Sequence, residues 1–297
     1  MLFRSLRMRL GEAYERQGDF PKAVAAYEEA FKSNPKLLPA ALKLAQLNAG
    51  ALKNSAKALE FAKKAHDIAP NDPKAAEILG RVSYQSGNYP VAYGLLQPAA
   101  RQPAANADVL HDFAWVAYVT GRVAEARATM ERLVKDAPNS PHLADAQSFL
   151  ALTALADGSG DIAAAAPEID KALAANPTYL PALMPRSALQ AQKGDAKTAA
   201  ATYAEITTKY PDFAPAQKRL AAIYAADPAT RDKAYTLAIR RAHRCRTTPS
   251  SHNSSASSTT SAKTRRARSS SSTKARRRSR SPAGRRGRAR TASRPWR

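Results

Sequence analysis

The stretch that decides the fold runs from Arg4 to Leu37 and reads RSLRMRLGEAYERQGDFPKAVAAYEEAFKSNPKL. Small and apolar residues recur in it at helical spacing, in two separate segments. They are Leu10, Gly11 and Tyr14 in the first segment, and Ala23, Tyr27 and Ala30 in the second. Gly18 lies between the segments and can adopt the positive φ of a tight turn. Pro35 ends the second segment because proline has no amide proton to donate. The stretch therefore predicts two short helices joined by a turn.

The same pattern recurs along the chain at a spacing of ~34 residues. Further copies begin near Leu38, Pro73, Ala107, Pro138, Leu180 and Ala214. The second copy has one extra residue near Asn54. In the third, Pro90 and Pro98 predict a second helix that is short or kinked. The fifth is stretched, and Asp157-Gly158-Ser159-Gly160-Asp161 is typical of an enlarged turn. One such hairpin cannot bury its apolar face alone, so the copies are expected to stack on one another.

The pattern L-G-x-x-Y, A-x-x-x-Y-x-x-A and a closing proline resembles the tetratricopeptide repeat, or TPR, and the resemblance covers residues 4–240 in about seven repeats. It implies an all-α solenoid, in which antiparallel helix pairs stack into a right-handed superhelix. It also implies a concave groove, lined by the first helix of each pair, that binds a peptide or protein partner. The function expected from the resemblance is a non-enzymatic protein-interaction scaffold, and its partner is unidentified.

The positive charge of the chain is concentrated at one end. The formal net charge is +23, yet 20 of the 47 Lys and Arg residues follow Asp232, after which no acidic residue occurs. The preceding part has 27 basic and 24 acidic residues, which is an ordinary balance for a helical protein. Residues 241–297 form a Ser/Arg-rich segment that we expect to be disordered.

Two interpretations of this tail stay open. A genuine polycationic tail would bind nucleic acid or another polyanion through its charge alone. Alternatively, a single-nucleotide frameshift near the codons for Ile239 to Arg244 would have replaced a further repeat. In the shifted frame, Arg246 can encode the proline that is due to end a helix, and Ala256 can encode the small residue of the next repeat. Because several such positions fall at the repeat period, we favour the frameshift, with polyanion binding as the alternative function.

Residues that carry catalysis or bind metals are not arranged in any familiar motif. Cys245 is the only cysteine, and the five histidines lack metal-ligand spacing. We therefore expect no enzyme activity, no metal and no cofactor. No stretch is apolar enough to span a membrane, and the first residues lack the pattern of a secretory signal. Since the chain enters its first helix almost directly, we expect it to begin inside a longer reading frame, where a signal would be missing.

The repeat spacing places candidate partner-binding residues on the first helices of repeats three and four. They are Arg81, Tyr84, Gln85, His111, Trp115 and Tyr118. Aromatic and cationic side chains are frequent in binding hot spots. The alternative is that Trp115 and Tyr118 pack between repeats without contacting a partner. The Ala-rich texture is typical of bacterial TPR proteins of envelope or exopolysaccharide systems, so we expect a cytoplasmic or periplasmic location beside such a system.

Overall fold

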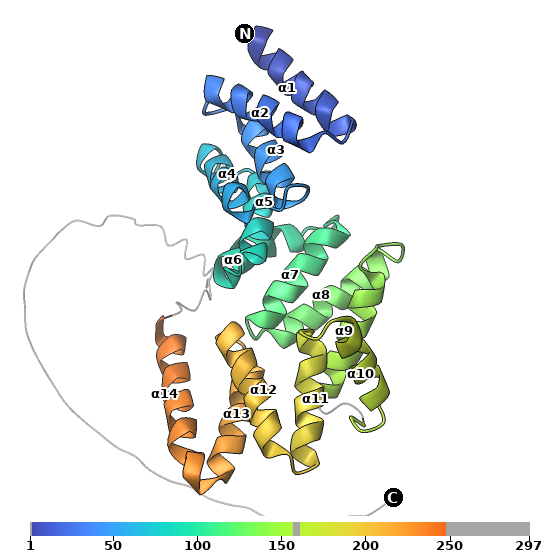
Figure 1. The fold of residues 1–297 in the computed structure, drawn as a ribbon, viewed down its shortest axis with the longest axis vertical. Helices are drawn as coiled ribbons and strands as arrows, with labels where there is room; N and C mark the ends of the chain where they lie inside the picture. The colour runs from blue at the N-terminus through green and yellow to red at the C-terminus, as the bar shows by residue number, and fades with distance from the viewer. Residues whose placement is uncertain (1, 157–160, 248–297) are drawn as a thin grey trace, which may run out of the picture. The chain divides into compact units, whose positions relative to one another are not determined.

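The computed structural model describes residues 2–156 and 161–247, which form a stack of paired helices (Figure 1). The first helices of the seven pairs are α1 (Leu2–Arg16), α3 (Leu38–Ala49), α5 (Pro73–Gln85), α7 (Ala107–Val119), α9 (Leu143–Ala156), α11 (Leu180–Gln192) and α13 (Ala214–Ala226). The second helices are α2 (Phe20–Ser33), α4 (Ser55–Ile68), α6 (Tyr89–Ala100), α8 (Val123–Asp136), α10 (Ala166–Ala175), α12 (Ala196–Lys209) and α14 (Arg231–Thr247). Pro228–Thr230 form a short 3-10 helix, and no strand occurs over the described ranges. The predicted all-α solenoid of helix pairs is confirmed.

The last helix extends past the boundary expected at residue 240. α14 ends at Thr247 and so includes the codons at which a frameshift was suspected. Residues 248–297, which hold most of the basic tail, lie outside the described residues, so both interpretations of the tail stay predictions. None of the helices described between residues 2 and 247 combines the length and the apolar character needed to cross a membrane.

The turn between the two helices of the first repeat has the conformation that its sequence predicts. Gly18 has a φ of +76°, and the Asp19 carboxylate after it accepts a hydrogen bond from the Lys22 amide at 3.2 Å. This is a helix N-cap, which satisfies one of the free amides at the start of α2. In repeat two the connection is longer, from Gly50 to Asn54, which agrees with the insertion expected there.

Close contact within a pair depends on a small residue in its first helix. A Cβ atom built on Gly11 would lie 2.5 Å from the Tyr27 ring, and one on Gly80 would lie 2.8 Å from Leu96 Cγ. Both distances are far below van der Waals contact. The side chain of the second helix therefore occupies the space that the glycine leaves free.

Leu10 shows what the stacking of repeats contributes. Its counterparts in the next three repeats, Leu44, Leu79 and Phe113, are all buried, whereas Leu10 is 45% exposed. The counterparts are covered by a helix of the preceding repeat as well as by their own pair. Among the described residues α1 packs chiefly against α2, so its apolar face is only half covered.

The prolines of repeat three change α6 as expected. α6 has 12 residues, whereas α4 and α8 on either side each have 14. Pro90 lies in the first helical turn, where a missing amide proton does no harm. Pro98 lies inside the helix, so the carbonyl of Gly94 cannot receive the usual hydrogen bond from the residue four positions later.

Repeat five is where the regular pairing changes. α9 packs chiefly against α8 and α11, and the 10-residue α10 packs against α11. The connection from Ala156 to Ala166 contains the extra residues. Of the predicted enlarged turn, residues 157–160 lie outside the described residues, and Asp161 begins the approach to α10.

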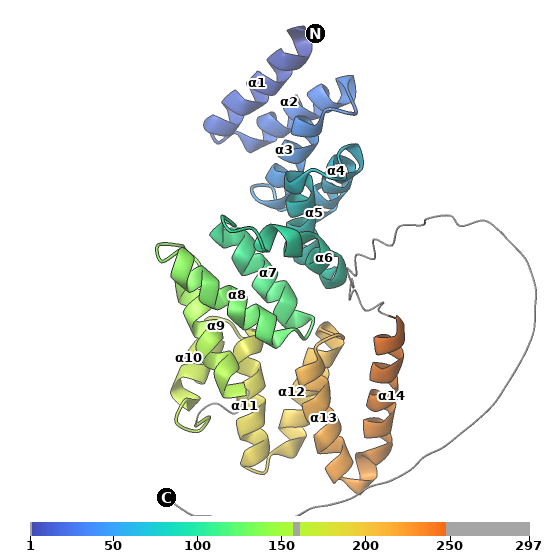
Figure 2. The same cartoon turned by 180° about the vertical axis from the view of Figure 1, so that it is seen from behind.

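Repeats three and four also contact repeats six and seven directly (Figures 1 and 2). The Tyr118 and Phe213 ring centroids are 5.0 Å apart, and those of Tyr89 and Tyr210 are 5.7 Å apart. Gly121, with a φ of +81°, lies so close to the connection before α13 that an added Cβ would be 3.0 Å from the Asp212 carbonyl oxygen. We call these contacts the skip contact, because they pass over repeat five.

Two glycines of repeat three give a matched test of close packing. Gly80→Ala should lower the free energy of unfolding by about 1–3 kcal/mol, because the new methyl group overlaps Leu96. Gly94→Ala should raise it by about 0.5–1 kcal/mol, since an added Cβ there would have open space around it. Urea unfolding followed by circular dichroism measures both. Equal effects of the two changes would contradict the packing described above.

The skip contact is tested by a different pair. Gly87 and Gly121 both have positive φ, so alanine at either position adds roughly 1–2 kcal/mol of backbone strain. Only Gly121→Ala also forces the Asp212 carbonyl away. We expect Gly121→Ala to be more destabilising than Gly87→Ala in urea unfolding and to increase hydrogen exchange at residues 212–216. If residues 212–216 exchange at the wild-type rate in Gly121→Ala, the skip contact does not stabilise the fold.

Candidate binding face across repeats three to six

Polar side chains on or just before successive first helices recur at a spacing of 34 residues. His111, Asp145 and Tyr179 are each 34 residues apart, as are Asp108 and His142. Stacking the repeats therefore brings these side chains together across the repeat boundaries. With Arg81, Asp112 and Trp115 they form what we call the cross-repeat network.

Arg81 links repeat three to repeat four. Its Nε donates to Asp112 Oδ2 at 2.8 Å, and its Nη2 lies 3.6 Å from Asp108 Oδ2. Asp108 is also 3.1 Å from His142 Nε2, at the start of repeat five. The two carboxylates of repeat four therefore bind cationic or donor groups on both neighbouring repeats.

His111 lies at the centre of the network and is largely buried. Its Nε2 is 2.9 Å from Asp145 Oδ2, and its Nδ1 is 3.5 Å from Asp112 Oδ1. Its ring stacks on that of His142, with centroids 4.1 Å apart and planes at 16°. Burial alone would lower the pKa of His111, but the hydrogen bonds to Asp112 and Asp145 outweigh it and raise the pKa to about 9. His111 is therefore a cation at neutral pH.

Asp145 receives three hydrogen-bond donors. Besides His111, these are Trp115 Nε1 at 3.2 Å and the Tyr179 hydroxyl at 3.0 Å. Trp115 Nε1 also lies 3.1 Å from His111 Nε2, but both ring nitrogens of a charged histidine are donors, so the indole donates to Asp145. Burial would raise the pKa of Asp145, yet the bonds from His111 and Trp115 lower it overall, so it stays ionised.

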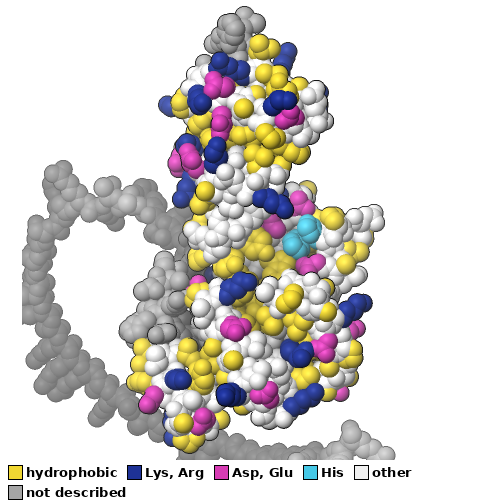
Figure 3. Space-filling view, viewed as in Figure 1, with side chains coloured by type: hydrophobic (Ala, Val, Ile, Leu, Met, Phe, Trp, Pro, Cys, Tyr) yellow, Lys and Arg dark blue, Asp and Glu magenta, His cyan; other side chains and the backbone are white. Residues whose placement is uncertain are grey.

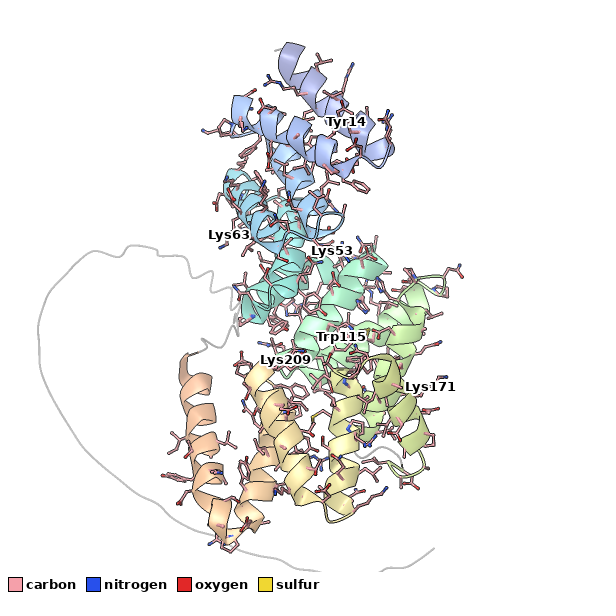
Figure 4. The ribbon with its side chains drawn as sticks, viewed as in Figure 1. Tyr14, Lys53, Lys63, Trp115, Lys171 and Lys209 are labelled. Carbon is pink, nitrogen blue, oxygen red and sulfur yellow. The ribbon has the colours of Figure 1, made fainter. Side chains whose placement is uncertain are left out.

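The six predicted residues have different environments. Arg81, His111 and Trp115 belong to the network, and Trp115 lies among side chains of α7, α9 and α11 (Figure 4). Tyr84 is half-buried beside Tyr89, and burial raises the pKa of its hydroxyl. Gln85, the last residue of α5, is exposed.

Tyr118 is 1% exposed and belongs to the core rather than to the surface. Its ring packs against Trp115, Phe149 and Phe213, with centroid distances of 6.3, 4.9 and 5.0 Å. Tyr118 therefore packs between repeats, which is the alternative given in the sequence analysis. Trp115 is only partly buried and contacts both the core and the network.

Five network residues were not among the predicted site residues: Asp108, Asp112, His142, Asp145 and Tyr179. The spacing of 34 residues from His111 to Asp145 and on to Tyr179 is a signal that could have identified two of them. It was not used because candidate residues were taken only from the first helices of repeats three and four. The extra length lies after Ala156, so α9 keeps the spacing of the earlier first helices.

The network lies at the surface of one side of the molecule. Figure 3 shows histidine side chains there, flanked by acidic ones and next to a hollow with hydrophobic side chains. Within the described ranges, no cluster of histidine, cysteine and acidic residues is arranged to hold a metal ion. The arrangement can bind peptide groups, because it offers carboxylates, a guanidinium and an indole on a rigid support.

The charge of His111 predicts a pH dependence. Because its pKa rises from 6.5 to about 9 on folding, its contribution to stability is complete below pH 6.5 and is lost as pH rises through about 9. We expect the urea midpoint of the wild type to fall over this interval and that of His111→Gln to change much less. The difference between the two proteins, measured from pH 6 to pH 10, isolates His111. Parallel curves would show that His111 is not charged in the folded state.

Comparison with known proteins supports the repeat assignment. Two tetratricopeptide repeat models match residues 8–73 and 83–150. No curated protein sequence matches the chain. Among solved structures, it is similar to a tetratricopeptide repeat protein from Parabacteroides merdae, at 18% identity over 74% of this chain and 84% of the other, with a TM-score of 0.44.

Two further solved structures to which the chain is similar are PilF and PilW. PilF of Pseudomonas aeruginosa is 19% identical over 73% of this chain and 96% of its own, with a TM-score of 0.45. PilW, described as a type IV pilus biogenesis factor, is 20% identical over 73% of this chain and 98% of its own, with a TM-score of 0.42.

Proposed function

We propose that this chain, which is a tetratricopeptide repeat protein, serves as a non-enzymatic scaffold that binds an extended peptide segment of a protein partner. The first helices of repeats three to six provide the binding face. The observation that supports this most is the cross-repeat network, which spans four repeats and leaves part of its polar edge open to solvent.

The network has an inner and an outer part. Asp112 and His111 form the inner part, with side chains 14% and 16% exposed. Arg81 and Asp108 form the outer part, at 35% and 50%. The inner ion pairs hold the first helices at fixed positions, whereas the outer groups have donors and acceptors to spare.

An extended peptide matches this arrangement chemically. Its backbone alternates amide donors and carbonyl acceptors, which can pair with the Asp108 carboxylate and the Arg81 guanidinium. The partly buried Trp115 adds an apolar surface with an indole that is already oriented by Asp145. Because these side chains are held in place before binding, little conformational entropy is lost when a partner docks.

Gln85 allows a direct test, since it is exposed at the end of α5 beside Tyr84. A photo-crosslinking amino acid at position 85 should capture a defined protein partner in cells of the source organism. The same group at Lys63, an exposed residue of the second helix α4, serves as the control and should not. Identical capture patterns from the two positions would contradict binding on the first-helix face.

The double variant Arg81→Ala with Trp115→Ala should reduce capture at position 85 strongly, because truncation of a hot-spot residue weakens binding by ~2 kcal/mol or more. Arg101→Ala is the matched control, since Arg101 follows the second helix of repeat three and is 70% exposed. Circular dichroism must show that the double variant keeps its helicity. Capture unchanged by the double variant would place the binding surface elsewhere.

A further inference from the structure

The two second helices on either side of α6 in the sequence have a basic tenth residue, Lys64 in α4 and Arg132 in α8. The tenth residue is acidic in α2 and α12, where it is Glu29 and Glu205. Arg132 donates three hydrogen bonds to the connection after α6, to the carbonyl oxygens of Ala100, Gln102 and Pro103 at 2.5 to 3.0 Å. A guanidinium is suited to this because it offers five donors in a fixed planar arrangement. Arg132 therefore ties repeat four to the end of repeat three.

Lys64 occupies the corresponding place between repeats one and two. It lines a groove of about 390 Å³ together with Pro35, and its ammonium lies 5.0 Å from the Phe61 ring centroid. Two neighbouring boundaries thus have a cation of the protein's own at this position. The repeat between them does not.

In α6 the tenth residue is Pro98, which has no charge and no hydrogen-bond donor. The boundary between repeats two and three has a groove of about 940 Å³, lined by Pro98 and by the connection from Pro70 to Pro73. It is more than twice the volume of the groove that contains Lys64. The groove is large where the basic side chain is missing.

The walls of this groove favour a cation. Asp72 and Glu77 line it, against one lysine, Lys74, which pairs with Glu77 at 3.1 Å. The C-terminal end of α4 also borders it, and the free carbonyls of a helix end carry partial negative charge. His66 of this last turn lines the groove, and its Nδ1 is buried without a hydrogen-bond partner among the described residues.

We propose that the groove between repeats two and three, which we call the Pro98 groove, binds an arginine side chain of a partner protein. The partner's guanidinium takes the place that Arg132 takes one repeat later, bonding to the carbonyls at the end of α4 and to the carboxylates beside them. Proline and small residues around it leave room for the aliphatic part of that arginine. The residues that line this groove include none of the cross-repeat network, so the site does not depend on that network.

The experiment titrates the full chain with the peptide acetyl-Ala-Arg-Ala-amide and follows the Gly94 amide and the His66 ring by NMR. In the wild type both signals should shift with peptide concentration. A citrulline peptide, which has the same shape without the charge, should bind about tenfold more weakly or worse, as expected for the loss of a charge-assisted hydrogen bond.

Two variants at one position separate filling of the groove from a change in the helix. Pro98→Ala restores an amide donor and leaves the groove open, so peptide binding should persist. Pro98→Arg should fill the groove from within, abolish the shifts and give a higher melting temperature than Pro98→Ala. The proposal fails if the wild type shows no shifts, if citrulline acts as arginine does, if Pro98→Ala loses binding, or if Pro98→Arg still binds.

Discussion

Close approach of two helices at a small residue is the contact on which the rest of this structure depends. At Gly11 and Gly80 the second helix places a ring or a leucine where a side chain would otherwise be. This fixes the distance and angle within each pair, and the same distance repeated along the chain brings residues 34 apart into contact. The cross-repeat network is possible only because that spacing is regular, since a shift of one residue would move His111 away from Asp145.

The helices and turns could be predicted because each depends on the conformational preferences of residues that are close together in the sequence. Gly18 and Asp19 define a turn and a cap by themselves, and Pro90 and Pro98 shorten α6 for reasons that involve no distant residue. The polar network was only half predicted. His111 and Trp115 were placed on the first-helix face, but Asp145 was not, because the candidate residues were taken from repeats three and four only.

The skip contact could not be predicted by the same reasoning. Repeat periodicity describes neighbours, and the contact of Tyr118 with Phe213 joins residues almost three repeats apart in sequence. It accompanies the packing of α9 on α11 as well as on α8. In this arrangement Tyr118 lies in the core, although its spacing alone is equally compatible with a position in the groove.

A repeat array held only by neighbouring contacts can lose its units one at a time from either end. The contact of Gly121 with the connection before α13 makes a closed loop of repeats four to seven, so no unit within the loop can detach without opening a second interface. Among the described residues, repeats one and two are stacked on their sequence neighbours, and Leu10 of repeat one is half-covered. Under mechanical load the first two repeats would then peel away in small successive steps, whereas the remainder would yield in a single larger event.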